Sequence, residues 1–319
     1  MAEETLQLWT EYYRPQTFSE MKGQEKIVER VKAFVKSKNI PHLLFAGPAG
    51  IGKTTLALII AKELYGENWR HNILDLNASD ERGIDIIRNK VKDFARTKSM
   101  QTNVPKIIYL DESDSLTKEA QQALRRTMEN FSRTARFILS CNFSSKIIDP
   151  IQSRCTVFRF KPLDQKDVIK ILEHIGKEQH ISIGGKAADA IHEISQGDVR
   201  RAINILQSCA AINKNVTEHL VYEIVSAAQP QEIKHVLELA LNKEFVKSRE
   251  ALLSVMLKHG LSGLDIIKQI QRETWRLNIP DDKKVKLIER CGETEFRMVE
   301  GSDEFVQLEA LLASFITTT

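Results

Sequence analysis

One eight-residue segment constrains the fold of this chain more than any other. The segment from Gly47 to Thr54 reads GPAGIGKT and matches the phosphate-binding pattern GxxxxGK[ST]. An apolar run, His42 to Ala46, precedes it and is typical of a buried strand, whereas Thr55 to Lys62 follows and is typical of a helix. The pattern requires this strand–loop–helix context, so we favour a phosphate site over an ordinary glycine-rich turn.

The residue types in this loop suit a nucleoside triphosphate. Glycines let the backbone turn tightly, so that its N–H groups surround phosphate oxygens, and the next helix presents its positive N-terminal end to them. Lys53 is expected to reach the β- and γ-phosphates, and Thr54 to offer its hydroxyl to Mg²⁺. The predicted nucleotide-binding residues of the loop are Gly47, Pro48, Ala49, Gly50, Ile51, Gly52, Lys53, Thr54 and Thr55.

Polar residues at the ends of two later strands extend this prediction. The apolar run after Lys106 ends in Asp111 and Glu112, and ligands lie at that end of a strand in an α/β sheet. Asp111 is expected to hold Mg²⁺, directly or through water, and Glu112 to orient and polarise the attacking water. A solvated acidic turn is the alternative. A further strand, from Arg136 to Asn142, also ends in a polar residue, although a lone asparagine there is usually a turn residue.

Composition narrows the class of protein. The chain has 319 residues, enough for about two to three domains. Its net charge is only +3, so any contact with nucleic acid must be local. The cysteines form no CxxC pair, which argues against zinc ribbons and disulfide frameworks and favours a reducing compartment. Met1 to Glu4 carries no signal-peptide pattern and no apolar run could span a bilayer, so we expect an intracellular protein without a membrane partner.

Two segments have more than one interpretation. The opening segment, Trp9 to Pro15, is predicted to be an extended arm because Pro15 disfavours helix at Arg14. Its aromatic residues would pack on an adenine base or serve as ordinary packing residues. The segment 84–97 is predicted to be a helix with one buried face. Its basic residues recur every four positions and would either contact phosphates or form a solvated face. They are Arg88, Lys92 and Arg96.

The chain changes character after Lys161-Pro162-Leu163. From Asp164 onward strand signals stop and helical periodicity dominates, with Asp198 as a predicted helix cap. A second boundary is expected near residues 227–230. We therefore predict three domains, an α/β nucleotide-binding domain over 1–161 and two helical domains over 162–228 and 229–319.

Taken together, these motifs resemble the AAA+ ATPases and, more narrowly, the small subunits of archaeal replication factor C, which are sliding-clamp loaders. The resemblance covers essentially the whole chain. Its most specific pieces, in chain order, are Tyr13–Pro15, Gly47–Thr55, Asn77–Gly83, Asp111–Asp114, Ala123–Glu129, Ser153–Cys155 and Gly197–Arg200.

The resemblance implies a fold and a set of cofactors. The fold is an AAA+ domain with a parallel five-stranded sheet, a helical lid and an all-helical collar that holds a ring together. The cofactors are ATP and Mg²⁺, and the activity is ATP hydrolysis. The arm residues Tyr13, Arg14 and Pro15 would lie beside the adenine. Asn142 would be the first sensor and Arg200, on the lid, the second.

The resemblance also implies residues that act beyond their own subunit. Arg154 would be an arginine finger, which stabilises charge on a phosphoryl group held by the neighbouring subunit, although a surface or ion-pair arginine is the alternative. Basic residues at helix starts would follow the DNA backbone. The positions that match them are Arg82, Arg88 and Lys146. Lys92 and Arg96 stay undecided, and Arg125 and Arg126 have no assigned role.

The expected partners follow from the same resemblance. Several copies of the chain, with a distinct large subunit, would form a spiral that opens a PCNA-type sliding clamp and loads it onto primed double-stranded DNA in the cytoplasm. The helix 84–97 and the loop to Asn103 are the candidate clamp contact. Ser113 replaces an alanine common in relatives, and the zinc module of bacterial loaders has no cysteines here, which favours the archaeal or eukaryotic branch.

Two other functions stay open. The first is an AAA+ DNA translocase of the branch-migration type, which moves DNA without a clamp. The all-helical C-terminal segment argues against it, because such motors resemble proteins with winged-helix modules. The second is a non-catalytic subunit that binds ATP only to hold a complex together. The chain keeps Lys53, Asp111, Glu112 and Arg154, and such a subunit would not need this chemistry.

Overall fold

The computed structural model describes residues 8–80, 85, 87–97, 104–225 and 228–318. The chain divides into two compact units. The first runs to Ser182 and includes Ile191–Gln207, and the second contains Ile183–Ala190 and everything from Ser208 onward. The division into three domains, 1–161, 162–228 and 229–319, stays a prediction.

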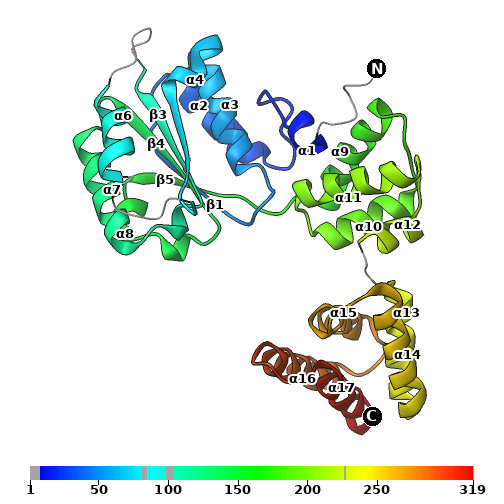
Figure 1. The fold of residues 1–319 in the computed structure, drawn as a ribbon. Coiled ribbons are helices and arrows are strands. Elements are labelled where there is room, and N and C mark those ends of the chain that lie inside the picture. Colours follow the sequence, from blue (N-terminus) through cyan, green and yellow to red (C-terminus); the bar gives the residue numbers. More distant parts are fainter. Residues whose placement is uncertain (1–7, 81–84, 86, 98–103, 226–227, 319) are drawn as a thin grey trace. The chain divides into compact units, whose positions relative to one another are not determined.

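A parallel five-stranded sheet forms the centre of the first unit (Figure 1). Its strands lie in the order β2-β3-β4-β1-β5, and each neighbouring pair is parallel, which confirms the predicted sheet. The strands are β1 (His42–Ala46), β2 (Ile73–Asn77), β3 (Lys106–Asp111), β4 (Ala135–Cys141) and β5 (Cys155–Arg159). We call the side of the sheet where the strands begin the amino edge, and the side where they end the carboxyl edge.

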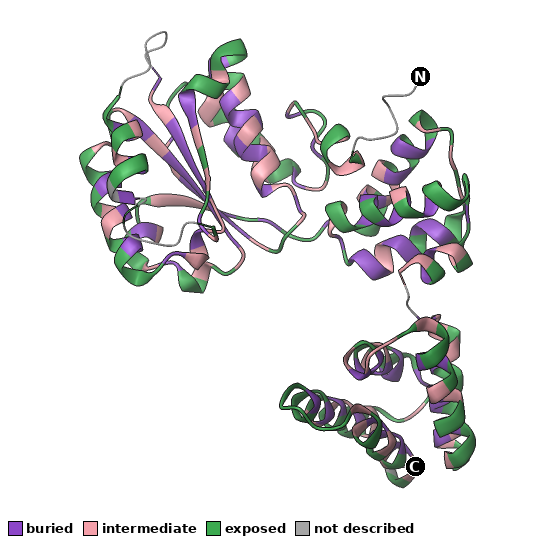
Figure 2. Ribbon diagram, viewed as in Figure 1, coloured by how far each residue is buried: buried purple, intermediate pink, exposed green. Residues whose placement is uncertain are grey.

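Helices cover both faces of this sheet (Figure 1). One face carries α2 (Glu25–Lys36) and α3 (Lys53–Tyr65), and the other carries α6 (Lys92–Arg96) and α7 (Lys118–Asn130). Because both faces are covered, the central strands are continuous apolar runs and are buried along most of their length (Figure 2). The register aligns Ala46 with Cys141, so the segments that follow these strands leave the sheet side by side at the carboxyl edge.

The two long helices differ in how they pack. Helix α3 is apolar almost all round, and Leu56, Ile59 and Ile60 are fully buried, as in a central helix. Helix α7 is amphipathic and buries Ala120, Leu124 and Met128, whereas Phe131, directly after the helix, is only partly buried. Thr117 caps α7, because its hydroxyl accepts a hydrogen bond from the Ala120 N–H at 3.2 Å.

The remaining helical segments before residue 228 are short or follow the sheet in the chain. The short ones are α1 (Trp9–Tyr12), η2 (Gly66–Asn68), α4 (Trp69–Asn72), η3 (Ile87–Val91), η4 (Ser113–Ser115), η5 (Ser144–Lys146) and α8 (Asp149–Gln152). Longer helices follow the sheet: α9 (Gln165–Glu178), α10 (Gly185–Ser195), α11 (Val199–Ile212) and α12 (Glu218–Ile224).

Three expectations about local structure need correction. The arm is not wholly extended, because α1 forms a helical turn in which the Leu8 carbonyl accepts from the N–H groups of Glu11 and Tyr12. Pro15 restricts only the residue before it and leaves this turn free to form. The start of the predicted helix 84–97 is π-helical over Ile87–Val91, and residue 84 lies outside the described residues. Two short strands, β6 (Ser182–Ile183) and β7 (Asn215–Val216), interrupt the region predicted to be helical.

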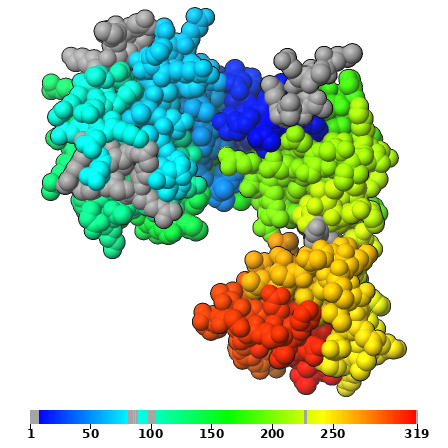
Figure 3. Space-filling model, viewed as in Figure 1, coloured from blue at the N-terminus to red at the C-terminus, as the bar shows by residue number. Residues whose placement is uncertain are grey.

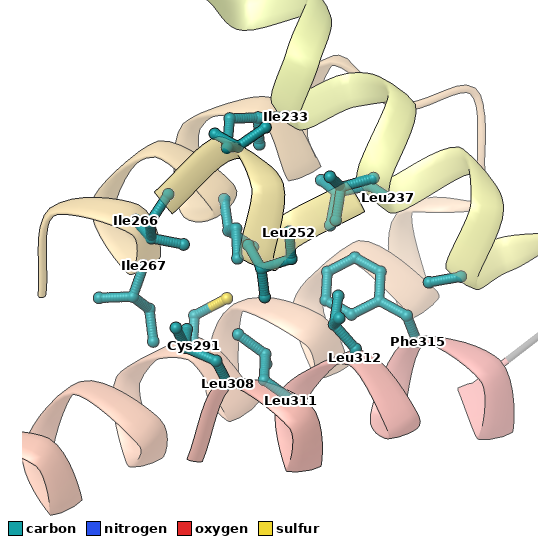
Figure 4. Packing of buried hydrophobic residues seen from close by; sticks show 14 of the residues in the cluster. Ile233, Leu237, Leu252, Ile266, Ile267, Cys291, Leu308, Leu311, Leu312 and Phe315 are labelled. Atoms are coloured by element: carbon teal, nitrogen blue, oxygen red, sulfur yellow. The ribbon is translucent and has the colours of Figure 1, made fainter. Parts of the chain in front are cut away.

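From residue 228 onward, every described element is a helix. These helices are α13 (Pro230–Leu241), α14 (Phe245–His259), α15 (Gly263–Arg276), α16 (Asp281–Val299) and α17 (Glu304–Thr318). Their apolar side chains converge on one core, in which Ile233, Leu252, Ile266 and Phe315 lie together (Figure 4). The space-filling view shows α15–α17, orange to red, as one close-packed body (Figure 3). Within the described ranges, no helix has both the length and the apolar composition needed to cross a membrane.

Candidate active site

The glycine-rich loop joins β1 to α3 at the carboxyl edge of the sheet. Gly50 and Gly52 have φ of +70° and +97°, a region that favours glycine, and Gly52 directly precedes α3. Within the described part of the chain, the N–H groups of residues 50–54 meet no hydrogen-bond acceptor, and no side chain caps α3. These donors and the positive end of α3 therefore form a site for an anion such as a phosphate group.

Lys53 lies buried inside this loop. Its ammonium donates to the carbonyl oxygens of Gly47 and Pro48, each at 2.6 Å, and to Asn142 Oδ1 at 3.2 Å. Burial lowers the pKa of Lys53, and the negative charge of Asp111 partly opposes this effect. The structure thus brings the predicted sensor Asn142 and the loop lysine together, from the ends of neighbouring strands.

Thr54 and Asp111 also meet at the carboxyl edge. The Thr54 hydroxyl donates to Asp111 Oδ2 at 2.7 Å, and Asp111 Oδ1 accepts from the Ser140 hydroxyl at 2.8 Å and the Glu112 N–H at 2.9 Å. Burial alone would raise the pKa of Asp111, but the hydrogen bonds from Thr54 and Ser140 outweigh it and hold that pKa below its usual range. The result is an ionised carboxylate beside a hydroxyl, the hard oxygen ligands that suit Mg²⁺.

Glu112 has an unusual backbone conformation. Its φ of +49° and ψ of +39° lie in the left-handed region, which is uncommon for a residue other than glycine and which the surroundings must enforce. The turn after it is fixed, because the Glu112 carbonyl accepts from the Ser115 N–H at 2.8 Å and the buried Ser113 hydroxyl donates to the Leu110 carbonyl at 2.8 Å. The Glu112 carboxylate has no recorded partner among the described residues, so it remains available to a water molecule.

Helix α11 begins directly on the glycine-rich loop. The Val199 N–H donates to the Gly50 carbonyl at 3.0 Å, and Asp198 Oδ1 accepts from the Arg201 N–H at 2.9 Å, which confirms the predicted cap. A Cβ on Gly50 would lie 1.8 Å from Asp198 Oδ1, so this approach needs glycine. Arg200 is exposed at the start of the same helix. Because Val199, the residue before it, donates to Gly50, the predicted second sensor lies near the loop. Burial is the main cause of the lowered pKa of Lys53, and the positive charge of Arg200 also lowers it.

The N-terminal arm contacts another helix. The Tyr13 hydroxyl accepts from Gln179 Nε2 at 2.7 Å, and its ring packs edge-on against His174. Burial raises the pKa of Tyr13. Arg14 pairs with Glu11 at 2.6 Å. No contact of Tyr13, Arg14 or Pro15 with the glycine-rich loop is recorded in the described part of the chain, so their place beside the adenine stays a prediction.

Asp114 is a residue of this site that sequence reasoning missed. Its two carboxylate oxygens accept from the backbone N–H groups of Asn142 and Phe143, at 3.3 and 3.2 Å. It therefore fixes the segment that carries the predicted sensor. Its position in the box Asp111–Asp114 was the only signal in the sequence. Ser140, which donates to Asp111, gave no signal beyond its strand.

Arg154 lies at the opposite edge of the sheet. It directly precedes β5, whose first residue is in register with His42 at the start of β1, whereas the glycine-rich loop follows the end of β1. At about 3.3 Å per residue, the length of β1 separates Arg154 from the loop by about 15 Å. Arg154 is exposed, donates to the Pro150 carbonyl at 2.7 Å and pairs with Glu129. The structure does not bring Arg154 to the loop of its own chain.

The predicted DNA-binding residues are only partly described. Arg82 lies outside the described residues, as does the candidate clamp loop 98–103. Arg88 falls within the turn η3, and its side chain is not described. Lys146 is exposed, with its ammonium 5.1 Å from the centre of the Phe143 ring. These three positions stay predictions.

Comparisons with known proteins match both halves of the chain. Residues 43–163 match the family described as "ATPase family associated with various cellular activities (AAA)", and residues 228–314 match "Replication factor C C-terminal domain". A protein named replication factor C small subunit from Methanococcus maripaludis is 54% identical over 305 residues, which cover 96% of this chain and 97% of the relative. A protein of the same name from Sulfurisphaera tokodaii is 54% identical over 309 residues, covering 96% and 94%.

Solved structures give a more distant match. The RuvB Holliday junction branch migration motor of Thermotoga maritima superposes with a TM-score of 0.56 at 19% identity, covering 76% of this chain and 85% of that one. At this level of identity the likeness shows the fold alone, which is that of an AAA+ ATPase.

Proposed function

This chain belongs to the replication factor C small subunits, the ATPase subunits of clamp loaders in DNA replication, and from that membership we propose how it works. Several copies of the chain assemble with a distinct large subunit. The ATP-bound assembly opens a PCNA-type sliding clamp and places it on primed double-stranded DNA. ATP hydrolysis at the contacts between subunits then releases the clamp around the DNA.

The carboxyl edge of the sheet supplies the residues for this chemistry. The N–H groups of the loop and Lys53 bind the phosphates of ATP, while Thr54 and Asp111 hold Mg²⁺. Bound Mg²⁺ neutralises phosphate charge. Glu112 orients and polarises the attacking water, and Asn142 and Arg200 contact the terminal phosphate. The support for these roles is the geometry of Lys53, Asn142, Thr54 and Asp111 at one strand edge.

One observation supports an active site that is shared between two subunits. Arg154 lies at the amino edge of the sheet, about 15 Å from the glycine-rich loop of its own chain by strand length. An arginine that stabilises the transferring phosphoryl group must touch it. Arg154 therefore acts on ATP bound by the neighbouring subunit, so hydrolysis depends on assembly.

The remaining assignments rest on the resemblance between motifs. Arg82, Arg88 and Lys146 follow the DNA backbone, and the segment 84–103 contacts the clamp. Tyr13, Arg14 and Pro15 lie on the adenine side of the nucleotide. The assembly works in the cytoplasm, at the DNA, without a membrane partner.

A DNA translocase is the main rival. The structural likeness to a branch-migration motor concerns the fold alone, whereas the region 228–314 matches the C-terminal domain of replication factor C and is helical throughout its described elements. A strand-displacement assay separates the two functions, because a clamp loader releases its DNA after one loading event and displaces no strand.

The experiment that tests the proposal is steady-state ATP hydrolysis by the chain with its large partner. It is measured alone, with primed DNA, with a PCNA-type clamp and with both. Strong stimulation that requires both supports the loader. Stimulation by DNA with no effect of the clamp would favour a translocase, and tight ATP binding without hydrolysis would favour a subunit that only holds the complex together.

A further inference from the structure

Arg154 belongs to a small cluster of charged side chains at the amino edge, together with Glu129 and Arg125. Glu129, one residue before the end of α7, accepts hydrogen bonds from two arginines through the same oxygen, Oε1. One donor is Arg125 Nη1, one helical turn earlier at 2.9 Å, and the other is Arg154 Nη2, from the segment between α8 and β5. A carboxylate therefore joins α7 to the predicted finger.

The stability of α7 explains little of the position of Glu129, because its ion pair with Arg125, one helical turn earlier, stabilises a helix only slightly. The C-terminal end of a helix carries partial negative charge, so a glutamate in the last turn is placed against the helix dipole. The side chains of Glu129 and Arg154 are also 36% and 37% exposed, and an exposed ion pair contributes little to stability. The feature that the pair does provide is a fixed direction for the Arg154 guanidinium.

That guanidinium is held at two points. Nη2 meets Glu129 on α7, and Nη1 donates to the Pro150 carbonyl on α8 at 2.7 Å. An arginine side chain is long and flexible, so an unsupported one would lose much rotational freedom on reaching a phosphate. Holding it beforehand removes part of that cost, and the remaining N–H donors are still able to bind phosphate oxygens.

We propose that Glu129 is a positioning residue that orients Arg154 toward the neighbouring subunit, and that Arg125 keeps the Glu129 carboxylate in place. This inference rests on the proposed role of Arg154 in the neighbour's active site. Glu129 does not itself touch ATP. It acts on the rate of hydrolysis next door and not on nucleotide binding in its own subunit.

The test uses the chain assembled with its large partner, with primed DNA and clamp present. Glu129→Gln keeps the size of the side chain and removes its charge, and we expect kcat to fall about tenfold because the finger loses its orientation. The KM for ATP should stay within about twofold, since the loop is untouched. Arg125→Gln should have a smaller effect in the same direction. Glu119→Gln, at the exposed start of α7, is the matched control and should leave kcat unchanged.

A double-mutant cycle separates this role from a structural one. In single-turnover measurements, Glu129→Gln should cause no further loss in a chain that already carries Arg154→Ala, because Glu129 acts only through Arg154. An equal further loss, a matching rise in KM or a kcat unchanged by Glu129→Gln would overturn the inference and leave the role of Arg154 intact. A normal rate for Arg154→Ala itself would instead overturn the proposed function.

Discussion

The two edges of the central sheet use charged residues in opposite ways. At the carboxyl edge, Lys53 is buried and Asp111 is partly buried, and both are held by partners within the chain. At the amino edge, Arg154 is exposed and is held only at the surface, by Glu129 and Pro150. The first edge contains the side chains and N–H groups of a phosphate and magnesium site, whereas at the second edge Arg154 is exposed and, in the proposed function, serves the neighbouring subunit.

This difference follows from where the charges must act. Phosphates that enter the glycine-rich loop meet donors that are already aligned and shielded from water, which strengthens each electrostatic contact. A cation that serves a neighbour must stay at the surface until assembly. In the proposed function, Arg154 makes hydrolysis depend on assembly and takes no part in nucleotide binding by its own chain.

Of the variants that test the difference between the two edges, Glu112→Gln should have the largest effect on ATP turnover. Glu112→Gln keeps the shape of the side chain but cannot polarise water, so turnover should fall by about 10²–10⁴-fold. ATP binding should be unchanged, because Lys53 and the N–H groups of the loop are intact. Turnover is followed by phosphate release and binding by a fluorescent nucleotide. Retained turnover would remove Glu112 from the catalytic centre.

A smaller effect is expected at Asp114. The Asp114 carboxylate accepts hydrogen bonds from two backbone N–H groups. In Asp114→Asn, the side-chain NH₂ group would face one of these donors and could not accept from it, so the segment carrying Asn142 should shift. Because a shift of about 1 Å can cost about a hundredfold in rate, we expect turnover to fall about ten- to a hundredfold. Asp164→Asn is the control, since that exposed aspartate makes no side-chain cap on α9. Equal rates for both variants would show that Asp114 does not position the sensor.

The smallest effect concerns stability at the amino edge. His42 Nδ1 accepts from the Phe137 N–H at 3.1 Å, and burial, aided by the charge of Arg136, lowers the pKa of His42 to about 4. As the pH falls from about 6.5 toward 4, the unfolded chain takes up a proton that the folded chain cannot, so stability decreases. Between pH 7 and pH 5 this costs about 2 kcal/mol.

His42→Asn isolates that contribution, because asparagine keeps an acceptor for the Phe137 N–H and does not titrate in this range. Urea unfolding of the full chain is followed at pH 7 and at pH 5. The free energy of unfolding should fall less between these two pH values in the variant than in the natural chain. The same loss in both would mean that the His42 imidazole is not kept neutral by the fold.

The sequence was most informative at the carboxyl edge. The loop Gly47–Thr54 is one continuous segment, and the rule that ligands lie where parallel strands end pointed to Asp111 beside it. The assignment of Asn142 as the sensor needed the family resemblance as well. What could not be predicted depends on how elements approach one another. The contact of Asp114 with Asn142, and that of Glu129 with Arg154, join segments 28 and 25 positions apart, which no periodicity reveals.

Local structure shows the same limit. The turn α1 formed although Pro15 follows it closely, because proline restricts only its immediate predecessor. The short strands β6 and β7 have two residues each, too few to leave an alternating pattern. In contrast, the helix cap at Asp198 was predictable, since capping depends on a single side chain and the next turn.

The measurement that most directly tests the shared active site is complementation between two inactive variants. Lys53→Ala removes ATP binding but keeps Arg154, and Arg154→Ala keeps ATP binding but offers no finger. Each is assembled alone with the large partner, and then both are assembled together, with primed DNA and clamp present. We expect almost no hydrolysis from either variant alone and clear hydrolysis from the mixture, where intact loops meet intact fingers. A mixture as inactive as its components, in assemblies shown to contain both variants, would contradict the account.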